Sequence, residues 1–361
     1  MPFWRIVVLS LVAITSSAAP AISVDGMRSE IKQFRVGENL LSGLLSRPAN
    51  DSAEALVIIV HGYGATNAID QDGYYELRAR LAGVGIASFV WDKPGSGRSE
   101  GQFDEDQPVA SSADEVVLAA QFLRSIDAPG SGQMGLWGRS RAGWIAPLAL
   151  SRDEDLAFWI SVSGVDDKES FGYLLESNWR MAGYPEQRIS HLLVQWINGN
   201  RAAAEGKDYS EVLELTPDYR ADPFVLGVVG GEQAFSESAF DKHQKTWQRL
   251  APAVDPSTGL MIYVDNFEGL LSSLNVPVLA LFGEKDSIVD WQSAKSLYEQ
   301  TIGQNPNASL SIKTFPDGNH NLHQCKTGGF NEMLEILKNP RTVDGYYDTV
   351  LTWLEKYVLE R

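Results

Sequence analysis

The chain has 361 residues, of which 44% are hydrophobic and 21% are charged, and this composition excludes a mainly disordered, collagen-like or coiled-coil protein. Its 47 acidic and 30 basic residues give a formal net charge of −17. That balance argues against nucleic acid or an anionic membrane surface as a partner, because both bind clustered cations. The single cysteine, Cys325, excludes an intrachain disulfide and a zinc site built on several cysteines.

Residues 1–21 are typical of a secretory signal peptide. Arg5 is the only charge before Asp25, and an apolar run, Ile6–Ile14, follows it. A membrane anchor is the alternative, but this run is shorter than the ~20 residues that a spanning helix needs. Ala19-Pro-Ala21 fits the small-residue pattern of cleavage sites, so we expect cleavage before Ile22. The predicted protein is exported, either periplasmic or secreted, with no stable membrane anchor.

Strands and helices are expected to alternate over the next part of the chain. Lys32–Val36 and Leu40–Ser46 form a predicted strand pair, and the apolar run Ala55–Val60 is typical of a strand buried on both faces of a parallel sheet. The further predicted elements are a helix at 74–81, a strand at 85–91, a helix at 113–126, a strand at 133–137, a helix at 141–150 and a strand at 156–162. Repeated βαβ units predict a mostly parallel sheet flanked by helices.

Helical periodicity replaces this pattern between residues 165 and 275. Ile189, Leu192 and Trp196, for example, recur at helical spacing. Sheet character then returns, with strands predicted at 276–282 and 309–315 and helices at 291–302 and 343–357. We therefore expect one α/β core domain, formed by residues 22–164 and 276–361, with residues 165–275 inserted as a helical cap.

The central motif is Gly135-Leu-Trp-Gly138-Arg-Ser140-Arg-Ala142-Gly143, between a predicted strand and a predicted helix. This is the context of a nucleophile elbow, a sharp turn that exposes a serine at the top of the sheet. Residues two before and two after the serine must be small, and Gly138 and Ala142 are small, although glycine is usual at the second position. Alone, the match does not distinguish a nucleophile from an ordinary strand–helix turn.

Other motifs raise the significance of this serine, because each follows a predicted strand. They are His61-Gly62-Tyr63-Gly64, Asp92–Ser99, Gly283-Glu-Lys-Asp286 and Gly318-Asn-His320. Open parallel sheets hold their binding sites at the edge where the carboxyl ends of the strands meet. We expect Asp92–Ser99 to be a structural turn near the site.

The order Ser140, Asp286, His320 is the order of the catalytic triad in α/β-hydrolases. With these motifs, the chain resembles the α/β-hydrolase superfamily over nearly all of its length after residue 21. The run Gly138–Pro147 followed by Ser161–Gly164 is similar to a bacterial group of esterases and serine-peptidase-like hydrolases, of the prolyl oligopeptidase-like or serine aminopeptidase-like type. The motifs are specific for the fold and poorly specific for the substrate.

The chemistry of such a site assigns a role to each residue. Ser140 is a weak nucleophile as an alcohol, so His320 takes its proton and later protonates the leaving group. Asp286 accepts the other imidazole N–H and thereby fixes the tautomer. The oxyanion of the tetrahedral intermediate needs backbone donors, for which the candidates are the N–H groups of Tyr63 and Arg141.

Two other histidines are alternatives for the base. His61 is expected to shape the oxyanion loop together with Gly62, because its motif supplies backbone donors. His323 forms His-x-x-His with His320, a spacing that suggests a metal pair, but no carboxylate or cysteine stands at metal-motif spacing. We expect no metal, and without a phosphate-binding or dinucleotide-binding glycine motif we expect no cofactor.

Asp290 and Asp317 are alternatives to Asp286, but only Asp286 lies in the turn directly after a predicted strand. Two arginines flank the serine. Arg139 is expected to point back into the fold and to be paired, because an unpaired buried charge is costly. For Arg141 a surface ion pair is favoured over contact with an acidic group of the substrate.

The sequence thus predicts an exported serine hydrolase that cleaves carboxylic esters through an acyl-enzyme, acting on a small-molecule ester or a short peptide. Peptide or amide hydrolysis by the same triad, as in an aminopeptidase-like enzyme, is the enzymatic alternative. A catalytically silent binding module of the same fold is the alternative from another class, but such modules usually lose triad members and here all three positions are filled.

Overall fold

The computed structural model describes residues 23–24, 26–167, 170–250, 255 and 260–360, so the predicted signal peptide lies outside the described residues. The described chain forms one nine-stranded sheet with the strand order β1-β2-β3-β5-β4-β6-β7-β8-β9. The strands are β1 (Ser23–Val24), β2 (Met27–Val36), β3 (Asn39–Pro48), β4 (Ala55–Val60), β5 (Ile86–Trp91), β6 (Met134–Arg139), β7 (Leu156–Val162), β8 (Pro277–Gly283) and β9 (Ser309–Phe315). Pairing is antiparallel from β1 to β5 through β3, and parallel from β5 to β9.

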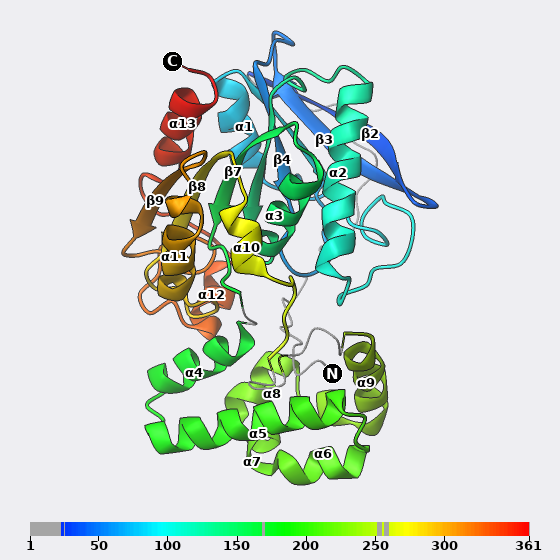
Figure 1. Cartoon of the computed structure of the whole chain (residues 1–361), viewed down its shortest axis with the longest axis vertical. Helices are drawn as coiled ribbons and strands as arrows, with labels where there is room; N and C mark the ends of the chain where they lie inside the picture. The colour runs from blue at the N-terminus through cyan, green and yellow to red at the C-terminus, as the bar shows by residue number, and fades with distance from the viewer. Residues whose placement is uncertain (1–22, 25, 168–169, 251–254, 256–259, 361) are drawn as a thin grey trace.

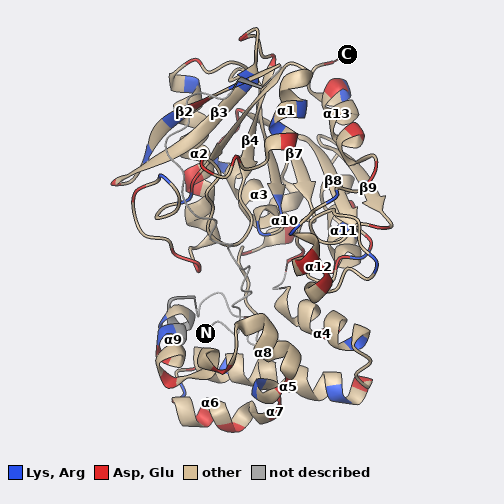
Figure 2. Cartoon of the chain, turned by 180° about the vertical axis from the view of Figure 1, so that it is seen from behind, with Lys and Arg blue, Asp and Glu red and all other residues tan. Residues whose placement is uncertain are grey.

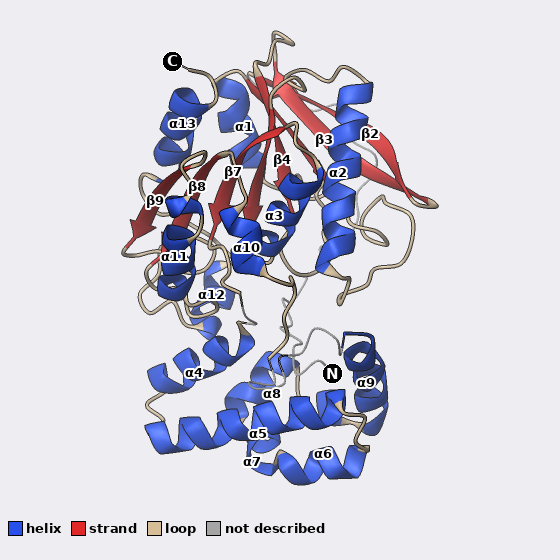
Figure 3. Cartoon of the chain, in the orientation of Figure 1, coloured by secondary structure: helices blue, strands red, loops and turns tan. Residues whose placement is uncertain are grey.

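Helices cover both faces of this sheet (Figure 3). They are α1 (Tyr75–Gly83), α2 (Val109–Ser125), α3 (Ala142–Arg152), α10 (Phe267–Ser272), α11 (Trp291–Gln300), the short η3 (Ile302–Gln304), α12 (Phe330–Ile336) and α13 (Tyr346–Tyr357). Side chains alternate across a strand, so β4 serves both faces. Its Val57 and Ile59 pack in the cluster that contains α1 and α13, whereas its Ile58 packs in the cluster that contains α2, α3 and α11.

Apolar strands explain why the sheet is buried on both sides. Every residue of β4 and β5 is buried, as expected for central strands covered by helices on both faces. Charged residues lie mainly on helices and loops, while β4 and β7 carry none (Figure 2). The predicted fold class, a mostly parallel sheet flanked by helices, is confirmed. The sequence pattern did not predict α12. The helix predicted to begin at Ala113 begins at Val109 in the structure.

The segment between β7 and β8 is helical, as its periodicity predicted. It contains α4 (Phe171–Met181), α5 (Glu186–Ala204), α6 (Tyr209–Leu215), α7 (Pro217–Ala221), α8 (Pro223–Val229), η1 (Glu232–Phe235) and α9 (Glu237–Leu250). These helices lie together at the end of the molecule opposite α13 (Figure 1). The chain then returns to the core, where α10 packs beside α3.

A buried carboxylate, Asp222, joins the helices of this segment. Its Oδ1 accepts hydrogen bonds from Trp179 Nε1 at 2.9 Å and from the backbone N–H of Phe224 at 3.0 Å, so it caps α8 as well as fixing α4. Its Oδ2 accepts from the Tyr184 hydroxyl at 2.9 Å. Asp222 is 1% exposed and Trp179 is fully buried, so loss of the carboxylate leaves buried donors unpaired.

We therefore expect Asp222→Ala to lower the free energy of unfolding by about 2–4 kcal/mol, combining a lost helix cap with unpaired buried donors. Asp218→Ala is the matched control, because Asp218 bonds His191 on the exposed surface of the same segment. The control should change stability far less than Asp222→Ala, because the Asp218 carboxylate is exposed. Urea unfolding followed by tryptophan fluorescence measures both, and equal losses in the two variants would contradict the role given to Asp222.

Candidate active site

The turn between β6 and α3 holds Ser140 in a conformation that is rare for serine. Its φ is 58°, in the left-handed region where a side chain meets the backbone. The Ser140 N–H donates to Val162 O of β7 at 3.0 Å, and the Gly143 N–H donates to Ser140 O at 2.7 Å. These bonds hold the turn at the carboxyl end of β6, and strain of this kind clusters at functional sites.

Close packing across the turn explains the small residues of the motif. A Cβ added to Gly138 would lie 2.6 Å from the Cβ of Ala142, which leaves no room for a side chain. A Cβ added to Gly143 would lie 2.8 Å from Val165 N, so the start of α3 also packs closely against the backbone that follows β7. Ala142, which stands where glycine is usual, therefore fits because the residue that faces it, Gly138, has no side chain.

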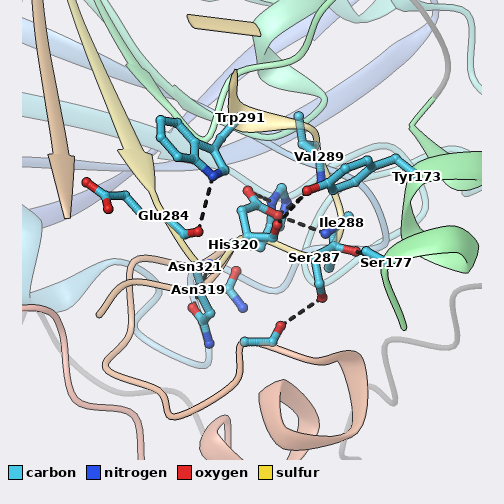
Figure 4. Close-up of polar contacts among 12 residues, drawn as sticks. Tyr173, Ser177, Glu284, Ser287, Ile288, Val289, Trp291, Asn319, His320 and Asn321 are labelled. Atoms are coloured by element: carbon cyan, nitrogen blue, oxygen red, sulfur yellow. Dashed lines mark hydrogen bonds and ion pairs between the residues drawn. The ribbon is translucent and has the colours of Figure 1, made fainter. Parts of the chain in front are cut away.

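Asp286, on the loop after β8, lies against His320, on the loop after β9. Figure 4 shows His320 beside Ile288 and Val289 of the β8 loop. The two atoms Asp286 Oδ2 and His320 Nδ1 lie 2.8 Å apart, and the residues are 4% and 6% exposed. Asp286 Oδ1 accepts from the backbone N–H groups of Ile288 at 2.9 Å and Val289 at 3.0 Å. Since an ionised carboxylate only accepts, the proton lies on His320 Nδ1, which leaves Nε2 as the free basic nitrogen.

The loop that carries His320 is fixed by its neighbour Asn319. The Asn319 side-chain oxygen accepts from the N–H groups of Asn321 at 2.9 Å and His323 at 3.1 Å. This loop also touches the Asp286 loop, because a Cβ on Gly283 would lie 2.4 Å from Gly318 O. The loop that carries the imidazole is thus held by the Asn319 side chain and by the close approach of the Gly283 backbone.

Ser140 lies at the same edge of the sheet as these two residues. Strand β7 separates β6 from β8, and the N–H of Ser163, just after β7, donates to Leu281 O of β8 at 2.8 Å. Two strand spacings amount to about 10 Å, a gap that side chains from the loops can bridge. No hydrogen bond joins Ser140 to His320 among the described residues. Hydrogen bonds between a serine and its base are often long in the absence of substrate.

The loop His61–Gly64 passes directly beside the serine. A Cβ on Gly62 would lie 3.1 Å from Arg139 O and 3.8 Å from the Ser140 Cβ. Within the described part of the chain, the backbone N–H groups of Tyr63 and Arg141 donate to no protein acceptor. The two predicted oxyanion donors therefore flank the serine with their hydrogens available.

His61 and His323 are poor candidates for a base at neutral pH. The His61 ring is 2% exposed and packs edge-on against Trp91 with the ring centroids 4.8 Å apart. Burial lowers the pKa of His61 to about 3, with a smaller contribution from the charge of Lys93. Burial also lowers the pKa of His323 to about 4, helped by the nearby Arg139.

The two arginines beside Ser140 differ from expectation. Arg139 has no ion-pair partner among the described residues, and it lines a cavity of about 760 Å³ with His323 and Tyr346. The guanidinium of Arg141 donates to Ser112 Oγ at 3.1 Å and to Gln107 O, again without a carboxylate within ion-pair distance in the described chain. The expected ion pairs are therefore wrong for both arginines.

Sequence reasoning missed the contacts made by helix α4. The Tyr173 hydroxyl donates to Asp286 O at 3.4 Å, and Ser177 Oγ donates to Ser287 O at 2.7 Å (Figure 4). Asn178 Oδ1 accepts from Phe330 N at 2.8 Å at the start of α12. These polar residues carry no motif, so only the folded arrangement identifies them.

Sequence reasoning also left Lys93 unassigned within the turn Asp92–Ser99. That turn is built on the Asp92 carboxylate, which accepts from Ile69 N at 3.2 Å and Arg98 N at 2.8 Å. Lys93 extends from it towards the loop His61–Gly64 and is 8% exposed. The turn therefore lies near the site, as the sequence predicted.

Two kinds of feature are absent from the described residues. They contain no group of three or more histidine, cysteine or acidic side chains arranged to hold a metal ion. Among the helices of the described chain, none is both long enough and apolar enough to cross a membrane.

Comparison with known proteins identifies the fold. No protein-family model matches the sequence. The chain is 28% identical over 129 residues to the quorum-quenching protein AidA of Acinetobacter baumannii, a match that spans 36% of this chain and 41% of that protein. The match thus covers less than half of the relative.

Solved structures give broader coverage at low identity. The esterase Pf2001 of Pyrococcus furiosus superimposes with a TM-score of 0.53 at 13% identity, over 91% of this chain and 91% of that chain. A candidate dipeptidyl aminopeptidase IV of Bacteroides ovatus has a TM-score of 0.51 at 14% identity, over 92% of this chain but 36% of that chain. The sheet topology and these likenesses confirm the α/β-hydrolase fold that the sequence motifs implied.

The depressed pKa of His61 predicts a pH dependence of stability. The folded protein keeps His61 neutral, whereas the unfolded chain protonates it below the ordinary histidine pKa of about 6.5. Unfolding then binds a proton, so stability falls as the pH drops below that value towards the folded pKa. Between about pH 7.5 and about pH 5 the linkage amounts to about 2 kcal/mol.

Urea unfolding of the parent and of His61→Gln at both pH values measures this contribution. The variant should lose about 2 kcal/mol less than the parent over the same pH range, because its side chain does not titrate. Identical pH dependence in the two proteins would show that His61 is as accessible to protons in the folded state as in the unfolded chain.

Proposed function

We propose that this chain, which has the α/β-hydrolase fold, is an exported serine hydrolase that cleaves carboxylic esters with Ser140, His320 and Asp286. The observation that carries the proposal is the buried 2.8 Å contact between Asp286 and His320, on loops at the sheet edge where Ser140 adopts its left-handed turn. A buried histidine–carboxylate pair beside a strained, half-exposed serine is the arrangement that activates an alcohol.

The reaction follows from these positions. Ser140 Oγ attacks the ester carbonyl carbon while His320 Nε2 takes its proton, and the carbonyl oxygen becomes an oxyanion that the N–H groups of Tyr63 and Arg141 stabilise. The bond to the leaving alcohol breaks as His320 returns the proton to its oxygen. Water then attacks the acyl-enzyme by the same steps, which releases the acid and restores Ser140.

An ester substrate is our first choice, because an esterase is among the structures that this chain resembles over nearly the whole of both chains. The Pf2001 esterase is similar over 91% of both chains, whereas the aminopeptidase-like protein is similar over 36% of its own length. Peptide hydrolysis by the same three residues stays the enzymatic alternative. We further propose the division into a core of residues 22–164 and 276–361 and a cap of residues 165–275, because Tyr173 and Ser177 reach the Asp286 loop from α4.

We expect Ser140→Ala to abolish turnover, by on the order of 10⁴-fold or more, because triad residues act as a unit. The variant should keep the parent's unfolding midpoint. A fluorophosphonate probe should label the parent and not the variant, and nitrophenyl esters of graded chain length should be hydrolysed faster than aminoacyl nitroanilides. Faster anilide cleavage would favour the peptidase, and absence of both labelling and turnover would favour a silent binding module.

Loss of His320 should be as damaging as loss of the serine, whereas His323→Ala should change kcat by less than about threefold, because His323 makes no contact with Asp286. The two histidines lie on one loop, so each variant is a matched control for the other. Rates on one nitrophenyl ester measure both. An inactive His323→Ala together with an active His320→Ala would reassign the base.

A further inference from the structure

Lys93 makes two contacts that the reaction above does not use. Its buried Nζ donates to Gly62 O at 2.7 Å and to Gly64 O at 2.7 Å, so one ammonium holds two carbonyls of the oxyanion loop. Hydrogen bonds from a charged donor are stronger than neutral ones. The lysine itself is fixed at its base, because its backbone N–H donates to Thr66 Oγ1 at 3.1 Å.

The first of these contacts fixes the direction of the Tyr63 N–H. The carbonyl of Gly62 and the N–H of Tyr63 belong to one planar trans peptide, so they point in opposite directions. Holding Gly62 O on Lys93 therefore aims the Tyr63 N–H away from the lysine. Rotation of that peptide would carry the carbonyl off the ammonium and leave a buried charge with one partner fewer, which is costly.

The surroundings of Lys93 leave the loop carbonyls as its main partners. No carboxylate forms an ion pair with its Nζ among the described residues. The pKa of Lys93 is lowered to about 7, mainly by burial and then by the charge of Arg141, while Glu115 acts in the opposite direction. The carbonyls of Gly62 and Gly64 are thus the hydrogen-bond partners that stabilise a buried ammonium in this place.

We propose that Lys93 is a positioning residue of the oxyanion hole, which holds the Gly62–Tyr63 peptide so that its N–H faces the carbonyl oxygen of the substrate. This inference rests on the proposed serine hydrolase function. Lys93 touches neither substrate nor reacting atoms, and it acts through the peptide that it orients. Its ammonium also polarises that peptide, which strengthens the N–H as a donor in a site of low dielectric.

A positioning role and a merely structural role predict different kinetics. An oxyanion hole stabilises the tetrahedral state more than the bound ester, so its loss lowers kcat and leaves KM nearly unchanged. Removal of one oxyanion donor costs about 10²–10³ in kcat, and a misdirected donor should cost somewhat less. A structural role alone would lower the unfolding midpoint without this selective loss of kcat.

The test compares Lys93→Met, which keeps the length and apolar stem but no donor, with the parent and with Lys295→Met. Lys295 is the control, because it lies on the exposed face of α11 in an ion pair with Glu299. The measurements are kcat and KM on a neutral nitrophenyl ester and the inhibition constant of a boronic acid that forms a tetrahedral adduct with the serine.

We expect Lys93→Met to lower kcat by about 10- to 100-fold, with KM changed by less than about threefold and boronic acid affinity lowered by the same factor as kcat. Lys295→Met should match the parent. Lys93→Arg, which retains charged donors, should recover part of both losses. If Lys93→Met does not fold, Lys93→Gln replaces it, because it is also uncharged and too short to reach both carbonyls.

A folded Lys93 variant with the parent's kcat and boronic acid affinity would overturn the proposal, and so would a kcat loss without any loss of boronic acid affinity. Failure of the hydrolase proposal looks different, because the parent itself would then show no Ser140-dependent turnover and no fluorophosphonate labelling.

Discussion

The left-handed backbone of Ser140 is the constraint on which the rest of the site depends. A residue with a side chain adopts this conformation at a cost, so the surrounding structure must hold it there. Gly138 and Ala142 make the turn sterically possible, and the bond from Ser140 N to Val162 O ties it to the next strand. Gly62 then allows the second loop to approach the serine. Each small residue of the motif therefore permits one close contact that a larger side chain would block.

The proposed base and its carboxylate depend on a second arrangement, built across two strands. Asp286 accepts three hydrogen bonds, two from its own turn and one from His320, so the turn orients the carboxylate independently of the histidine. Helix α4 adds a hydroxyl from Tyr173 to the backbone of the same turn. The helical segment between β7 and β8 thus contacts the carboxylate loop directly, through Tyr173 and Ser177 of α4.

Local patterns in the sequence were sufficient to predict the sheet and the loops that carry the motifs. The apolar runs of β4 and β5 predicted buried strands, and the glycines and serine around residue 140 predicted a tight turn. Whether Arg139 and Arg141 form ion pairs could not be predicted. The presence of a carboxylate within ion-pair distance depends on segments that are far away in sequence. Lys93 was missed for the same reason: its partners are carbonyls of Gly62 and Gly64, and backbone carbonyls have no sequence signature.

These unpaired cations have a common physical effect on the site. The chain carries a formal net charge of −17, yet Lys93, Arg139 and Arg141 lie near Ser140 without ion-pair partners among the described residues. In the proposed reaction a negative charge forms on a carbonyl oxygen, and nearby carboxylates would oppose that charge. Lys93 is buried and Arg141 is partly buried, which strengthens their effect because the dielectric is low, while the charge of Glu115 acts on both of them in the opposite direction. In the proposed hydrolase the motif positions the serine, and these cations act on the negative charge of the oxyanion.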